Sequence, residues 1–401
     1  MSAAVMRNPE TNRGEALIEA ALALQDDIRS RRGEIEAQRR VPLDLIEKLK
    51  TAGFFRMTMP KDWGGMELDP MTQLRAIEIL AEADASVAWC VMIGSDTGYF
   101  SAFIDQDVAK AMFPDVDMIT GSTLTTTGHA EIVDSGYHVS GRMPFSSGCE
   151  HSDWFVVGCL VYRDGEQCFH DSGIPVTRQC FVPRHAVTIL DTWDTIGLRG
   201  SGSHDLEIAG HFVPEAQSFS FQDFKPYRMS PLYVFPMSIL LNFSSVPLGI
   251  ASSVIDGFAE RSHRPARKTM INGQMTPPKN QCDDFFVQDA IGRAAAKLAS
   301  ARAYLYSTIE GFWQTLNSGA EPQPEQAAHF YLVHTHVFES CKEAIELVYK
   351  ISGGGAVYKK NQIERSLRDI QTINQHVINS LRSYSVGGRL LLGLPAEEIL
   401  L

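Results

Sequence analysis

The stretch IERSLRDIQTINQH, residues 363–376, decides the fold of this chain. It is typical of a helix near the C-terminus, and it carries the neighbours Arg368 and Asp369 followed by the lone His376. A glycine triplet, Gly353–Gly355, lies just upstream. Clustered glycines leave backbone N–H groups free for phosphate oxygens, and the start of a following helix adds its dipole. Taken alone, a glycine triplet is more often a loop that ends a helix, so both interpretations stay open.

His376 also allows two interpretations. A lone histidine on a buried helix face is usually a hydrogen-bonded core residue. In a binding cavity, however, a histidine suits proton transfer, because its ordinary pKa of about 6.5 lies close to neutral pH. The residue type alone does not separate a structural role from a chemical one.

The bulk composition excludes several classes of protein. The 401 residues, 44% hydrophobic and 21% charged, suit two or three domains or one large enzyme. A net charge of −12 argues against nucleic acid as a partner. Seven scattered cysteines without a CxxC pair argue against disulfides or a metal site. With no signal-peptide pattern and no run approaching about 20 apolar residues, we expect a soluble, cytoplasmic protein without membrane contact.

The hydrophobic period changes twice along the chain. Residues 1–117 show helical spacing, including a helix that Pro42 opens and Gly53 closes. Residues 118–218 contain short segments rich in Val, Ile and aromatic residues between Gly, Pro and Asp, which predicts antiparallel strands in a small barrel or sandwich. Residues 219–401 are helical again, in four long segments. The sequence therefore predicts an α+β protein in three domains.

Two glycine-containing segments of the β region are candidates for ligand contact. In GRMPFSSGCEHSDWF, residues 141–155, the hydroxyls of Ser146 and Ser147 and the small Gly148 suit the close approach of a planar ligand. Most Ser-Ser-Gly runs are polar turns. In DTWDTIGLRGSGSHDLEIAGHFVPE, residues 191–215, Arg199 sits in a glycine-rich turn before a strand. Arg199 is either a ligand contact or a solvated charge.

Three segments together resemble the acyl-CoA dehydrogenases. MPKDWGG, residues 59–65, stands where that family has a Pro-Glu-x-x-Gly-Gly loop, and residues 191–215 match a β-domain segment down to its closing Val-Pro-Glu. SGGGAVYKKNQIERSLRD, residues 352–369, is similar to the family's Gly-Gly segment, which contacts the flavin phosphates, partly from a neighbouring subunit. The resemblance covers about residues 15–393. It implies an N-terminal α domain, a middle antiparallel β barrel, a C-terminal four-helix bundle and a homotetramer.

The acids that serve as catalytic base in the dehydrogenases are missing. The position of the usual glutamate holds Val377, beside His376, and the alternative position before Pro247 falls in FPMSILLNFSSV, which has no acid. In this respect the chain resembles the flavin-dependent monooxygenases that share the fold, the oxygenase components of two-component systems acting on phenols, indoles and sulfur heterocycles. Several of these bring a further histidine from the helix near residues 89–103, where this chain has Ser95, Asp96 and Tyr99.

The monooxygenase resemblance implies a mechanism. Reduced FMN or FAD (FMNH2 or FADH2), supplied by an NAD(P)H-dependent flavin reductase, would react with O2 to a C4a-hydroperoxide that transfers oxygen to a small aromatic substrate. We favour an indole-type compound. Ser146 or Ser147 would bond near flavin N5, and His376 would act as acid or base.

The remaining site residues follow from the same resemblance. The predicted cofactor-binding residues are Ser146, Ser147, Gly148, Arg199, Gly353, Gly354, Gly355, Arg368 and Asp369. The predicted substrate contacts are Trp89, Ser95, Tyr99 and Phe243, and no metal is expected. Two alternatives stay open: an acyl-CoA dehydrogenase or oxidase with a displaced base, and a non-catalytic flavoprotein that keeps the fold for assembly.

Overall fold

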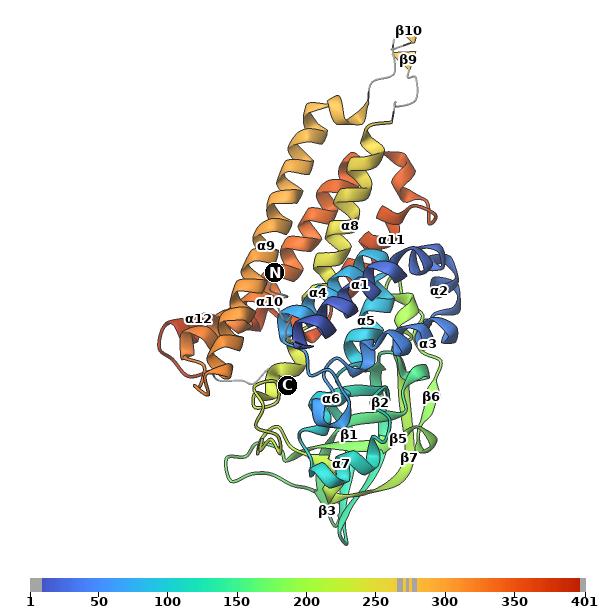
Figure 1. Ribbon diagram of the computed structural model, residues 1–401. Helices are drawn as coiled ribbons and strands as arrows, with labels where there is room; N and C mark the ends of the chain where they lie inside the picture. The colour runs from blue at the N-terminus through green and yellow to red at the C-terminus, as the bar shows by residue number, and fades with distance from the viewer. Residues whose placement is uncertain (1–8, 265–269, 272–273, 276–279, 397–401) are drawn as a thin grey trace, which may run out of the picture.

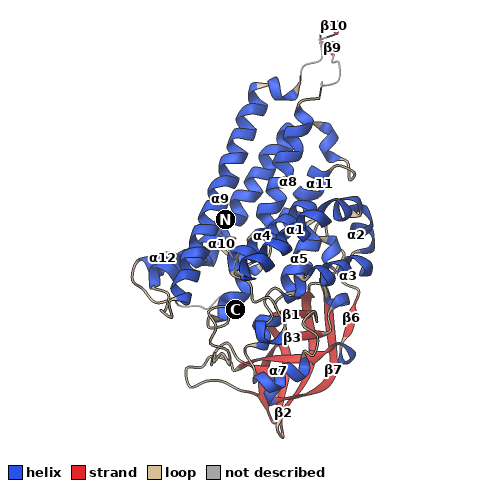
Figure 2. Cartoon of the chain, in the orientation of Figure 1, coloured by secondary structure: helices blue, strands red, loops and turns tan. Residues whose placement is uncertain are grey.

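The computed structural model describes residues 9–264, 270–271, 274–275 and 280–396 (Figure 1). Helices from both ends of the sequence lie together, and the strands from the middle of the sequence form a separate body beside them (Figure 2). The N-terminal helices lie between the long C-terminal helices and the strands (Figure 1). The expected order of helices, then strands, then helices is confirmed.

Short-range signals set the ends of the N-terminal helices. Pro42 precedes α3, and Gly53 ends it in the left-handed conformation at φ 94°, where a side chain would be strained. Asp69 and Asp84 cap α4 and α5 by accepting hydrogen bonds from backbone N–H groups. The residues of helical spacing before Pro42 form two helices, which are separated at Arg31. The helices are α1 (Pro9–Ser30), α2 (Arg32–Gln38), α3 (Leu43–Ala52), α4 (Pro70–Ala83), α5 (Ala85–Gly94), α6 (Thr97–Ser101) and α7 (Gln106–Met112).

The middle segment forms one sheet with the path β6-β7-β2-β1-β3-β5-β8, and β4 pairs with β3. Two expectations need correction. The sheet is open, since the described residues form no ladder that joins β6 to β8, and the β1–β3 ladder is parallel. The other ladders of this sheet are antiparallel as predicted. The strands are β1 (Thr120–Val133), β2 (Gly136–Ser146), β3 (Trp154–Arg163), β4 (Glu166–Gln167), β5 (Thr177–Pro183), β6 (Thr188–Leu190), β7 (His204–Pro214) and β8 (Ser218–Phe219).

Two irregularities in the sheet shape its edge toward the helices. The pairing of β1 with β3 shifts between Thr123 and Gly128. The pairing of β2 with β7 shifts between Met143 and Ser146, where Phe145 has a φ of 64°. Bulges of this kind turn side chains away from the regular alternation of a strand. Both face the region where the helices meet the sheet.

The C-terminal part contains three long helices, α8, α9 and α10, which pack side by side (Figure 1). The helix α11 is shorter, and α12 packs against α10 as a further helix. The coarser expectation of a helical C-terminal part is confirmed. The elements are α8 (Ser245–Ser262), β9 (Met270–Ile271), β10 (Gln274–Met275), α9 (Phe285–Asn317), α10 (Pro324–Ile351), α11 (Gln362–Ile373) and α12 (Leu381–Leu391).

The hydrophobic core does not follow the three predicted segments. One cluster runs from Leu17 in α1 to Ile370 and Ile373 in α11, so the two helical parts share a core. A second, smaller cluster, which includes Met143 and Phe155, lies within the sheet. Burial of apolar surface therefore ties the N-terminal helices to the C-terminal ones, although more than a hundred residues separate them in sequence.

One apolar stretch, Met237–Ser262, is long and apolar enough to span a membrane by composition, with a hydropathy of 1.6. The expectation that no run approaches this size is wrong here. Within the fold 89% of its most apolar 18-residue window is buried. A core helix of a globular protein has this character, because its apolar surface faces other helices.

A buried carboxylate joins α4 to α9. Glu78 is fully buried and accepts hydrogen bonds from Nε of Arg302 at 2.8 Å and from the hydroxyl of Tyr306 at 3.0 Å. Removing one partner of a buried ion pair leaves the other partners unsatisfied.

We therefore expect Glu78→Ala to lower the free energy of unfolding by about 2–4 kcal/mol. Urea unfolding followed by circular dichroism measures the loss. Glu310→Ala, on the exposed side of α9, the helix that carries Arg302 and Tyr306, is the matched control and should change stability little. Equal effects of both substitutions would contradict a special role for the Glu78 contacts.

Candidate active site

A cavity of about 1060 Å³ lies where the three parts of the sequence meet. Its walls come from α5, from the bulged part of β1, from the end of β2, from residues 193–203, and from α11 with the turn that follows it. A cavity of this size holds a cofactor ring together with a small substrate. The site is therefore a junction between parts of the chain and does not belong to one segment.

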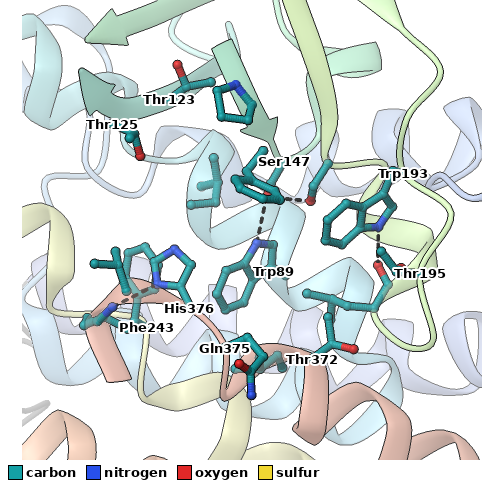
Figure 3. Close-up of a pocket in the computed structure, with 18 of the residues that line it drawn as sticks. Trp89, Thr123, Thr125, Ser147, Trp193, Thr195, Phe243, Thr372, Gln375 and His376 are labelled. Atoms are coloured by element: carbon teal, nitrogen blue, oxygen red, sulfur yellow. Dashed lines mark hydrogen bonds between the residues drawn. The ribbon is translucent and has the colours of Figure 1, made fainter. Parts of the chain in front are cut away.

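Three rings form one wall of the cavity: Trp89, Phe243 and His376 (Figure 3). The His376 ring lies 5.3 Å from the Trp89 ring in an edge-to-face arrangement and 4.9 Å from the Phe243 ring. Trp89 and Phe243 contact each other edge to face at 5.4 Å. The resemblance predicted Trp89 and Phe243 as substrate contacts and His376 as acid or base, and the structure brings all three to the same cavity.

His376 is electrically neutral at physiological pH. The surrounding protein shields the ring from water and lowers the pKa of His376 to about 4. Its Nδ1 accepts a hydrogen bond from the backbone N–H of Ile378 at 3.3 Å, so the neutral ring carries its proton on Nε2. His376 therefore offers a hydrogen-bond donor to a ligand at neutral pH and no charge.

Ser147 belongs to a chain of hydroxyl groups beside these rings (Figure 3). Nε1 of Trp89 donates to Oγ of Ser147 at 2.9 Å, and Ser147 lies 2.8 Å from Oγ of Ser203, which in turn contacts Ser201. An indole N–H can only donate, so the oxygen of Ser147 accepts from Trp89. The Ser147 proton then goes to Ser203 or to a ligand in the cavity.

Several predicted residues lie outside the cavity wall. Ser146 is fully buried, and its hydroxyl has no hydrogen-bond partner in the described part of the chain. Gly148 turns the chain at φ 66° beside Cys90. Ser95 donates to the carbonyl of Met92, and Tyr99 donates to Gln73, both within the core. Of the adjacent serines, the structure therefore presents Ser147 to a ligand.

Arg368 and Asp369 hold a loop of the sheet against α11. Asp369 accepts a hydrogen bond from the N–H of Leu198 at 2.6 Å, and Arg368 donates to the carbonyl of Ile196 at 2.6 Å. A Cβ on Gly197 would lie 2.1 Å from the Arg368 carbonyl, so only glycine allows this approach. Ile196 and Leu198 line the cavity, whereas Arg368 and Asp369 do not.

The other predicted phosphate contacts lie apart from the cavity wall. Arg199 pairs with Asp194 at 2.8 Å and donates to the carbonyl of Thr195. Gly353–Gly355 are exposed and lie at the far end of α11 from His376. Space is open around each of the three glycines. Within one chain they do not meet the residues around His376.

Two parts of the wall were not expected from the sequence. Thr123–Thr126 come from β1, a strand whose Thr- and Gly-rich sequence lacks clear alternation. Trp193 belongs to the loop 191–203, and its Nε1 donates to the carbonyl of Leu198. The run of threonines at 125–127 was a possible signal for a polar strand beside a ligand.

The wall suits a flavin ring with its alternating donor and acceptor atoms. Thr123 lines the cavity with a hydroxyl that is almost fully buried and has no partner in the described part of the chain. Ser147 and His376 add polar atoms between large rings. A metal centre has no comparable support, since the described residues contain no group of three or more His, Cys, Asp or Glu side chains that could hold an ion.

Comparisons with known proteins agree with this site. The model "Acyl-CoA dehydrogenase, N-terminal domain" matches residues 15–115, and "Acyl-CoA dehydrogenase, C-terminal domain" matches residues 241–381. Indole-3-acetate monooxygenase of Acinetobacter baumannii is 29% identical over 384 residues, which cover 94% of this chain and 95% of that protein. A flavin-dependent monooxygenase oxygenase subunit, HsaA of Rhodococcus jostii, is 27% identical and covers 94% of this chain and 98% of its own. The solved HsaA monooxygenase of M. tuberculosis superposes with a TM-score of 0.86 at 26% identity, over 97% of this chain and 100% of that one.

The two family models together span more than half of the sequence, and the chain belongs to the acyl-CoA dehydrogenase family. Within this family it is a flavin-dependent monooxygenase. The expected class of protein, a flavin-dependent monooxygenase with the acyl-CoA dehydrogenase fold, is therefore confirmed.

The buried carboxyl group of Asp369 should make the stability of the protein depend on pH. Burial raises its pKa from 3.8 to about 7, so the folded protein loses stability as pH rises from about 4 to 8 and the carboxyl must ionise. Asp369→Asn keeps an oxygen for the Leu198 N–H and cannot ionise.

Relative to the wild type, Asp369→Asn should therefore gain stability with rising pH, by at most about 4 kcal/mol at pH 8. Urea midpoints at pH 5 and pH 8 measure this difference. Asp134→Asn, at an exposed turn, is the control. A stability difference that stays constant between the two pH values would refute the raised pKa.

Proposed function

We propose that this monooxygenase is the oxygenase component of a two-component system. It takes reduced FMN or FAD from a separate NAD(P)H-dependent flavin reductase and hydroxylates or epoxidises a small aromatic substrate, with an indole-type compound favoured. One oxygen atom of O2 enters the substrate, and the other leaves as water with the two electrons of the reduced flavin. The names of the relatives, which include an oxygenase subunit, support a separate partner component.

The observation that best supports the proposed function is a neutral His376 in a cavity that holds no carboxylate suited to act as a base. Of the described residues that line it, Asp194 alone carries a carboxyl group, and this group is 79% exposed and paired with Arg199. Removal of an α-proton from a thioester needs a general base that faces the substrate, and the imidazole of His376, with its pKa lowered to about 4, is a weak base. The alternative of an acyl-CoA dehydrogenase with a displaced base therefore has no carboxylate base among the described lining residues.

The residues of the chain would act mainly as donors and as a barrier to water. When bound, reduced flavin supplies the electrons that activate O2. Ser147, held by Trp89, would donate its proton toward the flavin ring, and the orphaned hydroxyl of Thr123 would bond a ring heteroatom. His376 would donate Nε2–H to the substrate or to the oxygen being transferred. The rings of Trp89 and Phe243 would exclude water from the reacting atoms.

The proposal includes a homotetramer in which neighbouring subunits complete one another's flavin sites. Arg199 and the exposed glycines 353–355 remain candidates for the flavin phosphates, and the glycines would reach the phosphates of a neighbouring subunit in a homotetramer. Arg368 and Asp369 would act on the cofactor through the loop 196–198. The proposal also includes three domains, residues 1–117, 118–218 and 219–401, and a cytoplasmic location.

The decisive experiment mixes the purified protein, without oxygen, with reduced FMN or FAD and an indole, and then admits oxygen. An oxygenase forms oxygenated indole in proportion to the flavin consumed. A dehydrogenase instead purifies with tightly bound FAD that bleaches when acyl-CoA is added without oxygen. If reduced flavin, oxygen and a panel of indoles and phenols yield hydrogen peroxide alone, the proposed function is wrong.

The adjacent serines provide a matched pair of variants. Ser147→Ala removes the hydroxyl in the cavity, and we expect the share of flavin electrons lost as hydrogen peroxide to rise about tenfold, the effect of one hydrogen bond. Ser146→Ala, one residue away and outside the wall, should leave that share near the wild-type value. Peroxide and product assays measure both. An equal response of the two variants would show that Ser147 has no special role.

His376→Ala should lower product formation about 100-fold and leave flavin affinity nearly unchanged, because it removes a donor near the substrate. Since the pKa of His376 lies at about 4, its imidazole should add no inflection near pH 6.5, and an inflection near pH 7 that disappears in Asp369→Asn belongs to Asp369. Rapid-mixing product assays from pH 5.5 to 8.5 measure this, with the exposed His185→Ala as control. Unchanged turnover of His376→Ala would remove the residue from the mechanism.

A further inference from the structure

We infer that the cavity selects an uncharged aromatic substrate and rejects aromatic carboxylates. The inference rests on the proposed function, since it names the substrate class for that same site. The arrangement of charges and hydroxyl groups around the cavity carries it.

The cavity wall supplies no positive charge. Among its described residues, none is Lys or Arg, and the one fixed charge is the carboxylate of Asp194 at the rim. His376 cannot take the place of a cation, because its burial keeps the imidazole neutral at physiological pH. A substrate carboxylate would therefore meet neutral groups and one like charge.

The cations close in sequence to the wall are already engaged. Arg142 pairs with Asp205 at 2.7 Å. Arg199 pairs with Asp194 and donates to a backbone carbonyl. Arg368 pairs with Glu364 and Glu36, each at 2.7 Å, and donates to the carbonyl of Ile196. Moving any of these guanidinium groups toward a substrate would leave a carboxylate without its donor, which costs free energy.

The polar groups that do line the cavity suit neutral partners. They include hydroxyls and amides from four parts of the chain: Thr123 and Thr125 of β1, Ser147 beyond β2, Thr195 of the loop 191–203, and Thr372 and Gln375 at and just beyond the end of α11 (Figure 3). Hydroxyl and amide groups bond phenol O–H, indole N–H and carbonyl oxygens well. They compensate poorly for the hydration that a carboxylate loses on burial.

The chain as a whole carries a net charge of −12, which disfavours the approach of an anionic substrate over longer distances. The lining of the cavity and the net charge of the chain therefore both disfavour an anionic substrate.

Two ligand pairs isolate charge from shape: indole-3-acetamide with indole-3-acetate, and 4-hydroxyphenylacetamide with 4-hydroxyphenylacetate. Equilibrium dialysis against the full chain without flavin gives the four dissociation constants. In at least one pair, we expect the amide to bind about 100-fold more tightly than the acid, because an unpaired carboxylate is costly to bury. Equal or tighter binding of the acids, or failure of both amides to bind, overturns the inference.

A substitution in the wall should reverse the preference. Thr372 lies in the last turn of α11, where a positive charge also suits the helix dipole. Thr372→Arg should tighten indole-3-acetate at least about tenfold through a charge-assisted hydrogen bond. Thr372→Gln, similar in length and uncharged, should not. If both variants bind the acid like the wild type, the cavity wall does not set the charge preference and the inference fails.

The dialysis results are independent of turnover. If the amides bind selectively but reduced flavin and oxygen give no oxygenated product, the proposed function fails while the charge selection stands. If oxygenated product forms equally from acids and amides, the proposed function stands and the charge selection fails.

Discussion

The hydrogen bond from the Leu198 N–H to Asp369 is the contact on which the site depends. It brings a loop of the sheet onto the backbone of α11, and Gly197 makes that approach possible because a side chain would overlap the Arg368 carbonyl. The loop then presents Trp193 to the cavity. On the other side, the end of α11 presents His376. A buried carboxylate thus fixes the two halves of the cavity relative to each other.

The same helix also fixes the N-terminal part. Arg365 donates to the carbonyl of Arg32 at 2.6 Å and lies 3.5 Å from Asp84, which caps the helix that carries Trp89. The cavity therefore stands at a junction of three parts whose positions depend on a few buried polar contacts. Such contacts are strong only when every partner is present. Stability of the junction and the geometry of the site are consequently linked.

Burial accounts for the chemical character of the site. Enclosure among rings keeps His376 uncharged, so the proton on its Nε2 is available for donation to a ligand. The Trp89 N–H fixes the oxygen of Ser147 and leaves its proton available. The sequence indicated these residues through the missing glutamate and the Ser-Ser-Gly run. It did not distinguish Ser147 from Ser146, because an irregular register with a left-handed Phe145 decides which serine faces the cavity.

Local signals in the sequence determined the order of helices and strands, the helix ends at Pro42 and Gly53, and the absence of an acid at positions 376 and 377. These features depend on residues close together in the chain, where backbone preferences and periodicity act. The tertiary structure alone decided the open sheet, the core shared by the two helical parts, and the contribution of Thr123 to the cavity. It also decided that Arg368 and Asp369 hold a loop. Those outcomes depend on contacts between residues distant in the sequence, which no local pattern records.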